Sequence, residues 1–251
     1  MTHRGLTRGG CGARLIYGIL AEPPILLRHR RESTQPAVAT AQVRGLPDGG
    51  NGNGHYLSGV APCTRLLILA MPSTKILAIS GSLRVGSLNS MLLRAARRLA
   101  PTDIEVDLYR DLHSLPLFNP DLEAMTPAVV AELRARIISS DAVLIASPEY
   151  ARGVTGVIKN ALDWMVGNES FVDKAVGLFN ASPRATIAQA ALRETLVTMS
   201  ARIIDDACVT VGILGSGLDE DGIVRDLNIS SSILRALRAL RCANESPRAS
   251  Y

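Results

Sequence analysis

The sequence predicts an α/β fold in which a parallel sheet is covered by helices on both faces. From Lys75 onward, short apolar runs typical of buried strands alternate with segments whose apolar residues recur at helical spacing. Strands that are apolar throughout are buried on both faces, and a helix between consecutive strands makes them parallel. We therefore expect a five-stranded parallel sheet and five helices in one three-layer domain.

The expected elements alternate regularly along the chain. Four of the strands are apolar runs, and the second, IEVDLY, alternates apolar with polar residues. Thr126 and Pro127 are typical of the N-cap and first position of the second helix. The strands are KILAIS (75–80), IEVDLY (104–109), DAVLIAS (141–147), KAVGLFNAS (174–182) and ACVTVGIL (207–214). The helices are SMLLRAARRLA (90–100), PAVVAELRARIIS (127–139), GVIKNALDWMV (156–166), TIAQAALRETLVTMSA (186–201) and SSILRALRAL (231–240).

The charge is unevenly distributed and excludes some classes of partner. Residues 1–70 hold eight arginines, no lysine and three acidic residues, whereas residues 71–251 hold 19 basic and 20 acidic residues. The near-neutral body lacks the basic patch of a nucleic-acid-binding protein. No apolar run reaches the roughly 18 residues that a membrane span needs. We therefore expect no nucleic-acid and no membrane partner.

The four cysteines are widely separated and form no C-x-x-C motif. Such spacing favours isolated thiols over disulfides or a metal site. We expect no metal and a reducing compartment, the cytoplasm.

The composition divides the chain into three parts. Residues 1–70 hold 11 of the 21 glycines, including PDGGNGNGH (47–55), and their pattern favours loop or disorder. We interpret residues 1–73 as a disordered or non-essential extension, with targeting as the alternative. Residues 74–243 form the predicted domain and 244–251 a tail.

Small polar residues follow three of the expected strands. These loops are GSLRVGSLN (81–89), SPEYARG (147–153) and NASPRA (180–185). In an open parallel sheet, ligands bind at the carboxyl ends of the strands, near the point where the strand order reverses. We therefore expect the three loops to meet at one edge of the sheet and to form a ligand site.

The first of these loops suits a phosphate. Ser82, Arg84, Ser87 and Asn89 come just before a helix whose first amides lack partners and carry partial positive charge. A phosphate there would gain backbone donors, hydroxyl donors and a cation together. A terminal phosphate needs no glycine fingerprint, which favours a mononucleotide. A serine-rich turn with an ordinary N-cap is an equally good explanation of this loop taken alone.

Two further loops are less specific. In the second loop, Pro148 stiffens the exit from the strand and Tyr150 offers an aromatic face and a hydroxyl, although a turn that covers the core edge would have the same residues. GSGLDEDG (215–222) is similar to part of a dinucleotide loop but lacks the G-x-G-x-x-G spacing, which favours an ordinary acidic loop.

Two long segments carry a resemblance to a known family. KILAISGSLRVGSLN and SPEYARGVTGVIKNALDW resemble the NADPH-dependent FMN reductase family, which includes flavin, quinone, chromate and azo-dye reductases of flavodoxin-like fold. The likeness covers about residues 74–240. It implies an FMN cofactor, NADPH or NADH as electron donor, and a homodimer or homotetramer. It places the cofactor against Ser82, Arg84, Ser87, Leu88, Asn89, Pro148, Glu149, Tyr150, Ala151 and Ser182.

One implied position departs from the family. Many members have Asn after PEY, and this chain has Ala151, so that only the backbone amide could serve there. The resemblance assigns no catalytic residue, because the redox chemistry belongs to the cofactor.

The resemblance implies an NAD(P)H oxidoreductase that passes electrons through FMN to a small acceptor such as a quinone, free flavin, azo dye or metal oxyanion. The alternative is a non-catalytic electron carrier of flavodoxin type. Carriers are usually strongly acidic for docking, and a body with a net charge of −1 argues against that class. An enzyme acting on phosphate esters would need a nucleophile with a base, and Ser82 and Ser87 have no candidate base.

Overall fold

The computed structural model describes residues 73–245. The predicted extension (1–73) and tail (244–251) therefore lie outside the described residues, apart from Ser73 and the first two residues of the tail. Those two residues, Asn244 and Glu245, complete the last helix.

The sheet is parallel, and its order confirms the expected fold class. Along the sheet the strands are arranged as β2-β1-β3-β6-β7, with β8 also paired to β6. The order reverses at β1, because the chain adds β2 on one side of it and the later strands on the other. The loops after β1 and β3 therefore flank the crevice where ligands bind in such sheets. The strands are β1 (Thr74–Ser80), β2 (Ile104–Tyr109), β3 (Ala142–Ala146), β6 (Ala175–Asn180), β7 (Arg202–Ile203) and β8 (Val209–Thr210).

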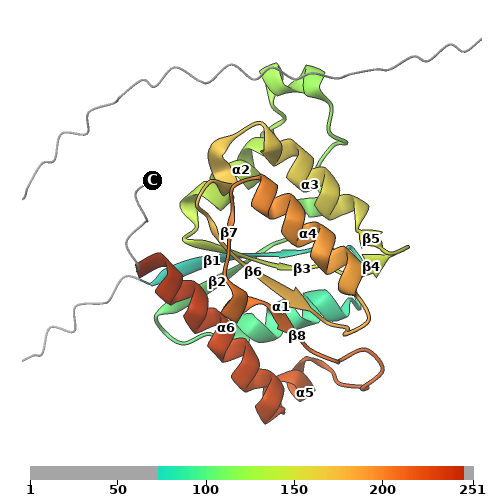
Figure 1. The fold of residues 1–251 in the computed structure, drawn as a ribbon, viewed down its shortest axis with the longest axis vertical. Helices are drawn as coiled ribbons and strands as arrows, with labels where there is room; N and C mark the ends of the chain where they lie inside the picture. The colour runs from blue at the N-terminus through green and yellow to red at the C-terminus, as the bar shows by residue number, and fades with distance from the viewer. Residues whose placement is uncertain (1–72, 246–251) are drawn as a thin grey trace, which may run out of the picture. The chain divides into compact units, whose positions relative to one another are not determined.

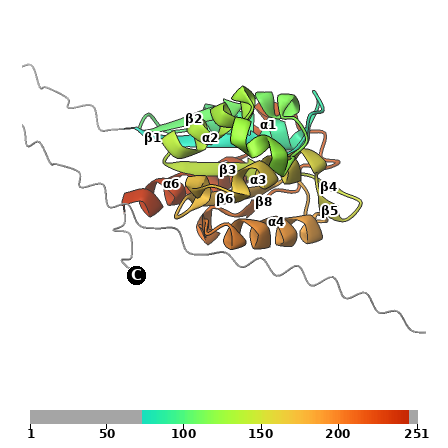
Figure 2. The same ribbon diagram turned by 90° about the horizontal axis from the view of Figure 1, so that it is seen from above.

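Helices cover both faces of the sheet, in the three layers visible in Figures 1 and 2. One face carries α1 (Leu88–Leu99), α5 (Glu220–Arg225) and α6 (Leu227–Glu245). The other carries α2 (Ala128–Ser139), α3 (Gly156–Val166) and α4 (Thr186–Thr198). The five expected helices are therefore present, and the structure adds the short α5.

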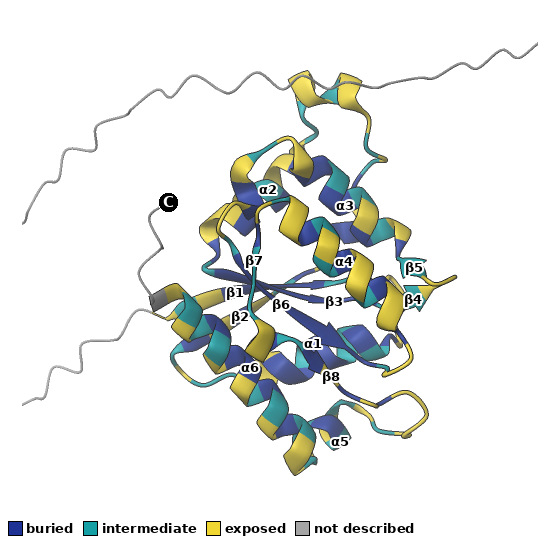
Figure 3. Cartoon of the chain, in the orientation of Figure 1, coloured by how far each residue is buried: buried dark blue, intermediate teal, exposed yellow. Residues whose placement is uncertain are grey.

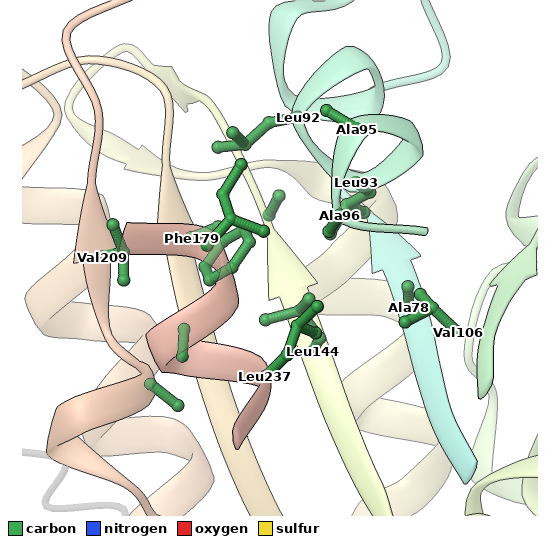
Figure 4. Packing of buried hydrophobic residues seen from close by; sticks show 14 of the residues in the cluster. Ala78, Leu92, Leu93, Ala95, Ala96, Val106, Leu144, Phe179, Val209 and Leu237 are labelled. Atoms are coloured by element: carbon green, nitrogen blue, oxygen red, sulfur yellow. The ribbon is translucent and has the colours of Figure 1, made fainter. Parts of the chain in front are cut away.

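The strands alternate their side chains between two hydrophobic clusters. In β1, Ile76 packs toward α1 and α6, whereas Leu77 packs toward α2, α3 and α4. Every residue of β3 is buried, as a central strand between two helical layers requires. Figure 3 shows this buried middle layer, and Figure 4 shows Leu144 and Phe179 of the sheet close to Leu92 and Leu237 of the helices.

The fifth strand differs from its prediction. A single strand was expected at 207–214, but β7 pairs with the start of β6 and β8 pairs with its end. The 3₁₀ turn Asp205–Ala207 lies between them and packs over Gly177, where an added Cβ would lie 2.9 Å from the carbonyl oxygen of Ala207. The glycine thus makes room for the interruption, and the sheet has six strands instead of five.

The second helix begins one residue later than expected. Pro127 occupies the N-cap of α2, and its carbonyl accepts from the amides of Val130 and Ala131. Thr126 does not cap the helix, because its hydroxyl donates to the carbonyl of Glu123.

Ion pairs join α1 to α5. Glu220 accepts from Arg94 at 2.7 Å and from Arg98 at 3.3 Å, and Asp221 accepts from Arg98 at 2.6 Å. The hydrogen bond from Arg94 lowers the pKa of Glu220, and the hydrogen bond from Arg98 lowers the pKa of Asp221. These contacts hold α5 against the helix that follows the first polar loop.

The lowered pKa of Glu220 leads to a prediction about acid stability. A carboxylate whose folded pKa is depressed stabilises the fold above its unfolded pKa, and this stability is lost as the pH falls through the folded pKa. We expect Glu220→Gln to lower Tm at pH 7 by about 2–4 °C, the shift that about 1 kcal/mol produces in a chain of this size. Thermal melts of the two proteins from pH 7 downward should converge below the ordinary Glu pKa of 4.5. A difference that stays constant to pH 3 would contradict this account.

No helix in the described range is long and apolar enough to cross a membrane.

Candidate functional site

The three polar loops meet around one cavity of about 340 Å³. This volume lies in the range of about 300–1,000 Å³ that small-molecule sites occupy. Nine of the ten expected site residues line it, and Ala151 is the exception. The lining residues are Ser82, Arg84, Ser87, Leu88, Asn89, Pro148, Glu149, Tyr150, Asn180, Ala181, Ser182, Arg184, Ala185 and Leu214.

The first loop ends at a helix N-terminus that suits an anion. Ser87 is the N-cap of α1, and its hydroxyl oxygen accepts from the amide of Ser90 at 3.3 Å. Capping uses the oxygen of Ser87 but not its hydroxyl hydrogen, which can still donate to a ligand. The helix begins at Leu88, so Leu88 and Asn89 lie in its first turn instead of before it. No acidic residue neutralises that turn, and Arg84 adds a cation.

Two residues not predicted as site residues fix the shape of this loop. The hydroxyl of Ser80 accepts from the amide of Ser82 at 3.3 Å and shares a 2.7 Å hydrogen bond with the hydroxyl of Ser90. Gly81 follows, and an added Cβ there would lie 2.3 Å from Oγ of Ser147. Because that contact is too short for any side chain, glycine lets the first and second loops pack directly together.

The second loop forms a tight hairpin beside the cavity. Strands β4 (Glu149–Tyr150) and β5 (Gly153–Val154) pair antiparallel and project from the sheet edge in Figures 1 and 2. The two turn residues, Ala151 and Arg152, have φ of 49° and 61°. Positive φ at both positions is the signature of a type I′ turn, which usually takes Asn and Gly. Ala151 therefore occupies a strained turn position next to the cavity rather than its wall.

The carboxylate of Glu149 binds another part of the protein. Its Oε2 accepts from the amides of Ile187 at 3.0 Å and Ala188 at 2.9 Å, in the first turn of α4. The N-cap of α4, Ala185, has no side chain that could do this. Glu149 thus caps α4 from a distance and fastens the second loop to the third.

The third loop is held by Asn180, which was not among the predicted site residues. Its side chain is buried, accepts from the amide of Ser182 at 3.0 Å and donates to the carbonyl of Ala185 at 3.2 Å. An Asn that ends a strand before a turn is a recognisable signal of such a local bond. The structure also adds Ala181, Arg184, Ala185 and Leu214 to the lining.

The cavity offers unsatisfied polar groups to a ligand. Oδ1 of Asn89 is buried without a hydrogen-bond partner. Arg84 and Arg184 form no ion pair with any residue of the described range. Since the carboxylate of Glu149 is already bonded to two amides, the free charges at the wall are positive. Tyr150, 58% exposed, adds an aromatic face. This set fits a planar ligand that carries an anionic group.

A second cavity of about 550 Å³ lies on the other side of the first loop, and Ser82 and Arg84 line both. It is larger, but no residue of the second or third loop lines it. Ser80 and Ser90 share a hydrogen bond, and His113 is within hydrogen-bonding distance of the carbonyl of Arg110 and the hydroxyl of Ser114. We therefore assign the ligand site to the smaller cavity, where three strand ends converge.

Residues 73–245 hold no group of three or more His, Cys, Asp or Glu side chains placed to bind a metal ion.

Comparison with known proteins agrees with this geometry. The sequence profile of the NADPH-dependent FMN reductase family matches residues 74–214. An NAD(P)H-dependent FMN reductase of Pseudomonas aeruginosa is 35% identical over 173 residues, which cover 66% of this chain and 93% of that relative. A quinone reductase of Escherichia coli is 31% identical over 153 residues, or 58% of this chain and 81% of that relative.

A solved structure supports the same assignment. The flavoenzyme NAD(P)H:(acceptor) oxidoreductase FerB from Paracoccus denitrificans is similar with a TM-score of 0.60 at 32% identity, over 68% of this chain and 97% of that one. The profile match spans more than half of the chain and includes all three loops of the cavity in full. The chain therefore belongs to the NADPH-dependent FMN reductase family of flavodoxin-like, FMN-dependent oxidoreductases.

Proposed function

We propose that the chain transfers electrons from NADPH or NADH, through FMN held in the 340 Å³ cavity, to a small acceptor such as a quinone. The observation that carries the proposal is the convergence at one sheet edge of the N-terminus of α1, with Arg84 beside it, and a wall that carries the aromatic ring of Tyr150. The relatives named as FMN and quinone reductases support the same class of acceptor.

The residues of the first loop would hold the phosphate. Ser82 and Ser87 supply hydroxyl donors, Arg84 supplies charge, and the unsatisfied Leu88 and Asn89 amides lie in the first turn of α1. The side chain of Asn89 is buried in the lining with Oδ1 unpartnered, so it can accept a hydrogen bond from a ligand hydroxyl.

The second and third loops would hold the ring. Pro148 and Tyr150 line one side of the cavity, and Ser182 lies on the third loop. Glu149 and Asn180 keep these two loops in place through bonds to α4 and to the loop backbone. FMN would supply the two-electron redox chemistry between nicotinamide and acceptor. The protein then needs to bind and orient the flavin ring and to leave it accessible.

We also propose a homodimer or homotetramer. Four large apolar side chains near the two cavities are more than half exposed, which favours covering by a second copy: Leu83, Val85, Tyr150 and Leu214. A monomeric mass by light scattering at micromolar concentration would contradict this.

One experiment separates the reductase from an electron carrier. Purified full-length protein loaded with FMN is mixed with NADPH without oxygen, and the visible flavin absorption is followed. We expect rapid bleaching that is reversed by a benzoquinone, with free FMN at equal concentration as the control for uncatalysed reduction. A protein that binds FMN but bleaches only after a separate reductase is added would be a carrier, and the proposal would fail.

A further inference from the structure

A smaller cavity adjoins the 340 Å³ cavity that is proposed to hold FMN, which we call the flavin cavity. It has a volume of about 300 Å³ and is lined by Ser182, Pro183, Arg184, Gly212, Leu214 and Gly215; we call it the side pocket. Ser182, Arg184 and Leu214 also line the flavin cavity, so the two spaces adjoin each other. The side pocket lies between the third loop and the segment that follows β8, and no residue of the first loop lines it.

The wall of the side pocket suits an anion. Arg184 is exposed, and its side chain forms no hydrogen bond or ion pair within the described range. Its backbone amide donates to the hydroxyl of Ser182 at 3.3 Å, which holds the turn that presents the guanidinium. No acidic side chain lines the pocket. Gly215 has φ of 82° and open space where a Cβ would lie, so a ligand can approach the backbone there.

The phosphate of FMN does not account for this second cation. In the proposed function, that phosphate is bound at the far end of the cavity by Arg84 and the first turn of α1. A nicotinamide that reaches the flavin ring must leave its diphosphate and adenosine outside the 340 Å³ cavity. The 550 Å³ cavity shares Ser82 and Arg84 with the flavin cavity, but no residue of the second or third loop lines it, so it adjoins the proposed phosphate end and not the ring. The side pocket adjoins the flavin cavity at the third loop, the proposed ring-binding end, and carries Arg184, which has no ion pair within residues 73–245.

We propose that the side pocket binds the adenosine-phosphate end of the nicotinamide dinucleotide, with Arg184 as the phosphate-binding residue. This inference rests on the proposed function and adds a donor-binding residue to it. Arginine is well suited to this role, because its planar guanidinium binds phosphate oxygens in pairs.

The test measures binding to FMN-loaded wild type and Arg184→Ala without oxygen, by calorimetry. The probes are ADP and 2′,5′-ADP, which cannot reduce the flavin, and Arg238→Ala on the exposed face of α6 is the matched control. We expect Arg184→Ala to weaken 2′,5′-ADP binding about tenfold or more, the loss of one charged hydrogen bond. Because Arg184 also lines the flavin cavity, FMN affinity is measured in parallel and should fall much less than 2′,5′-ADP affinity. Arg238→Ala should match the wild type.

The pattern across probes identifies the phosphate. If only the binding of 2′,5′-ADP is weakened, Arg184 binds the 2′-phosphate. Stopped-flow reduction of the flavin at low NADPH concentration should then be slower in Arg184→Ala, and reduction by NADH should not change. If both probes bind more weakly by the same factor, Arg184 binds the 5′-phosphate that the two share, which in the dinucleotide is part of the diphosphate. The inference is overturned if both probes bind Arg184→Ala as they bind the wild type, or if FMN affinity falls by as much as theirs. A wild type that NADPH does not reduce at all would instead overturn the proposed function.

Discussion

Replacing Arg84 by Ala should weaken FMN binding by roughly 10- to 150-fold. Arg84 is exposed at the cavity wall, has no ion-pair partner within residues 73–245, and stands beside a helix N-terminus without acidic residues. A charged hydrogen bond contributes on the order of 1.5–3 kcal/mol, and about 1.4 kcal/mol corresponds to a factor of ten. Flavin fluorescence titration measures the FMN affinity of the wild type and of Arg84→Ala.

Riboflavin separates phosphate recognition from general damage, because it has the ring but no phosphate. Its affinity should be the same in wild type and Arg84→Ala. Arg97→Ala, at the exposed far end of α1, is the matched control and should bind both flavins normally. If Arg84→Ala lowers the affinity for FMN and for riboflavin by the same factor, the loop has only a structural role. If neither affinity falls, the assignment of the phosphate to this loop is wrong.

Removing the carboxylate of Glu149 should weaken the binding of both FMN and riboflavin. Glu149→Ala deletes the acceptor for two amides in the first turn of α4 and releases the second loop from the third. Loss of a helix cap costs about 0.5–2 kcal/mol of stability. We expect a lower Tm and a decrease of about tenfold in affinity for FMN and for riboflavin alike. Equal losses for both ligands distinguish this variant from Arg84→Ala.

Two variants sharpen the result for Glu149. Glu149→Gln keeps an oxygen acceptor without charge and should retain part of both the stability and the affinity. Glu194→Ala removes an exposed carboxylate from the same helix and should behave as the wild type. If Glu149→Ala keeps full Tm and full flavin affinity, the bonds to α4 do not hold the site together.

Much of the site was predictable because parallel strands bring their carboxyl ends to one edge. Three polar loops separated by up to about a hundred residues could therefore be assigned to one cavity before its geometry was known. The start of α1 was also predictable from the sequence, since Ser87 is both the predicted phosphate ligand and the observed N-cap. The two readings of that loop are compatible, because capping uses only the hydroxyl oxygen.

The remaining features depend on contacts that local pattern does not encode. Glu149 bonds to residues 38 and 39 positions away, and no periodicity marks such a pair. The broken fifth strand escaped prediction because β7 and β8 have two residues each, too few to show a strand period. The turn at Ala151 and Arg152 adopts a conformation that favours Asn and Gly, so its residues gave no signal of a tight hairpin.

The most direct test of the central claim is a crystal structure of the protein with FMN. We predict the phosphate against Ser82, Arg84, Ser87 and the first turn of α1, and the ring between the hairpin that carries Tyr150 and the loop that carries Ser182. The larger cavity across the first loop offers a clear rival position, because Ser82 and Arg84 line both spaces. FMN bound in that 550 Å³ cavity, with its ring beside Leu108 and His113, would contradict the account.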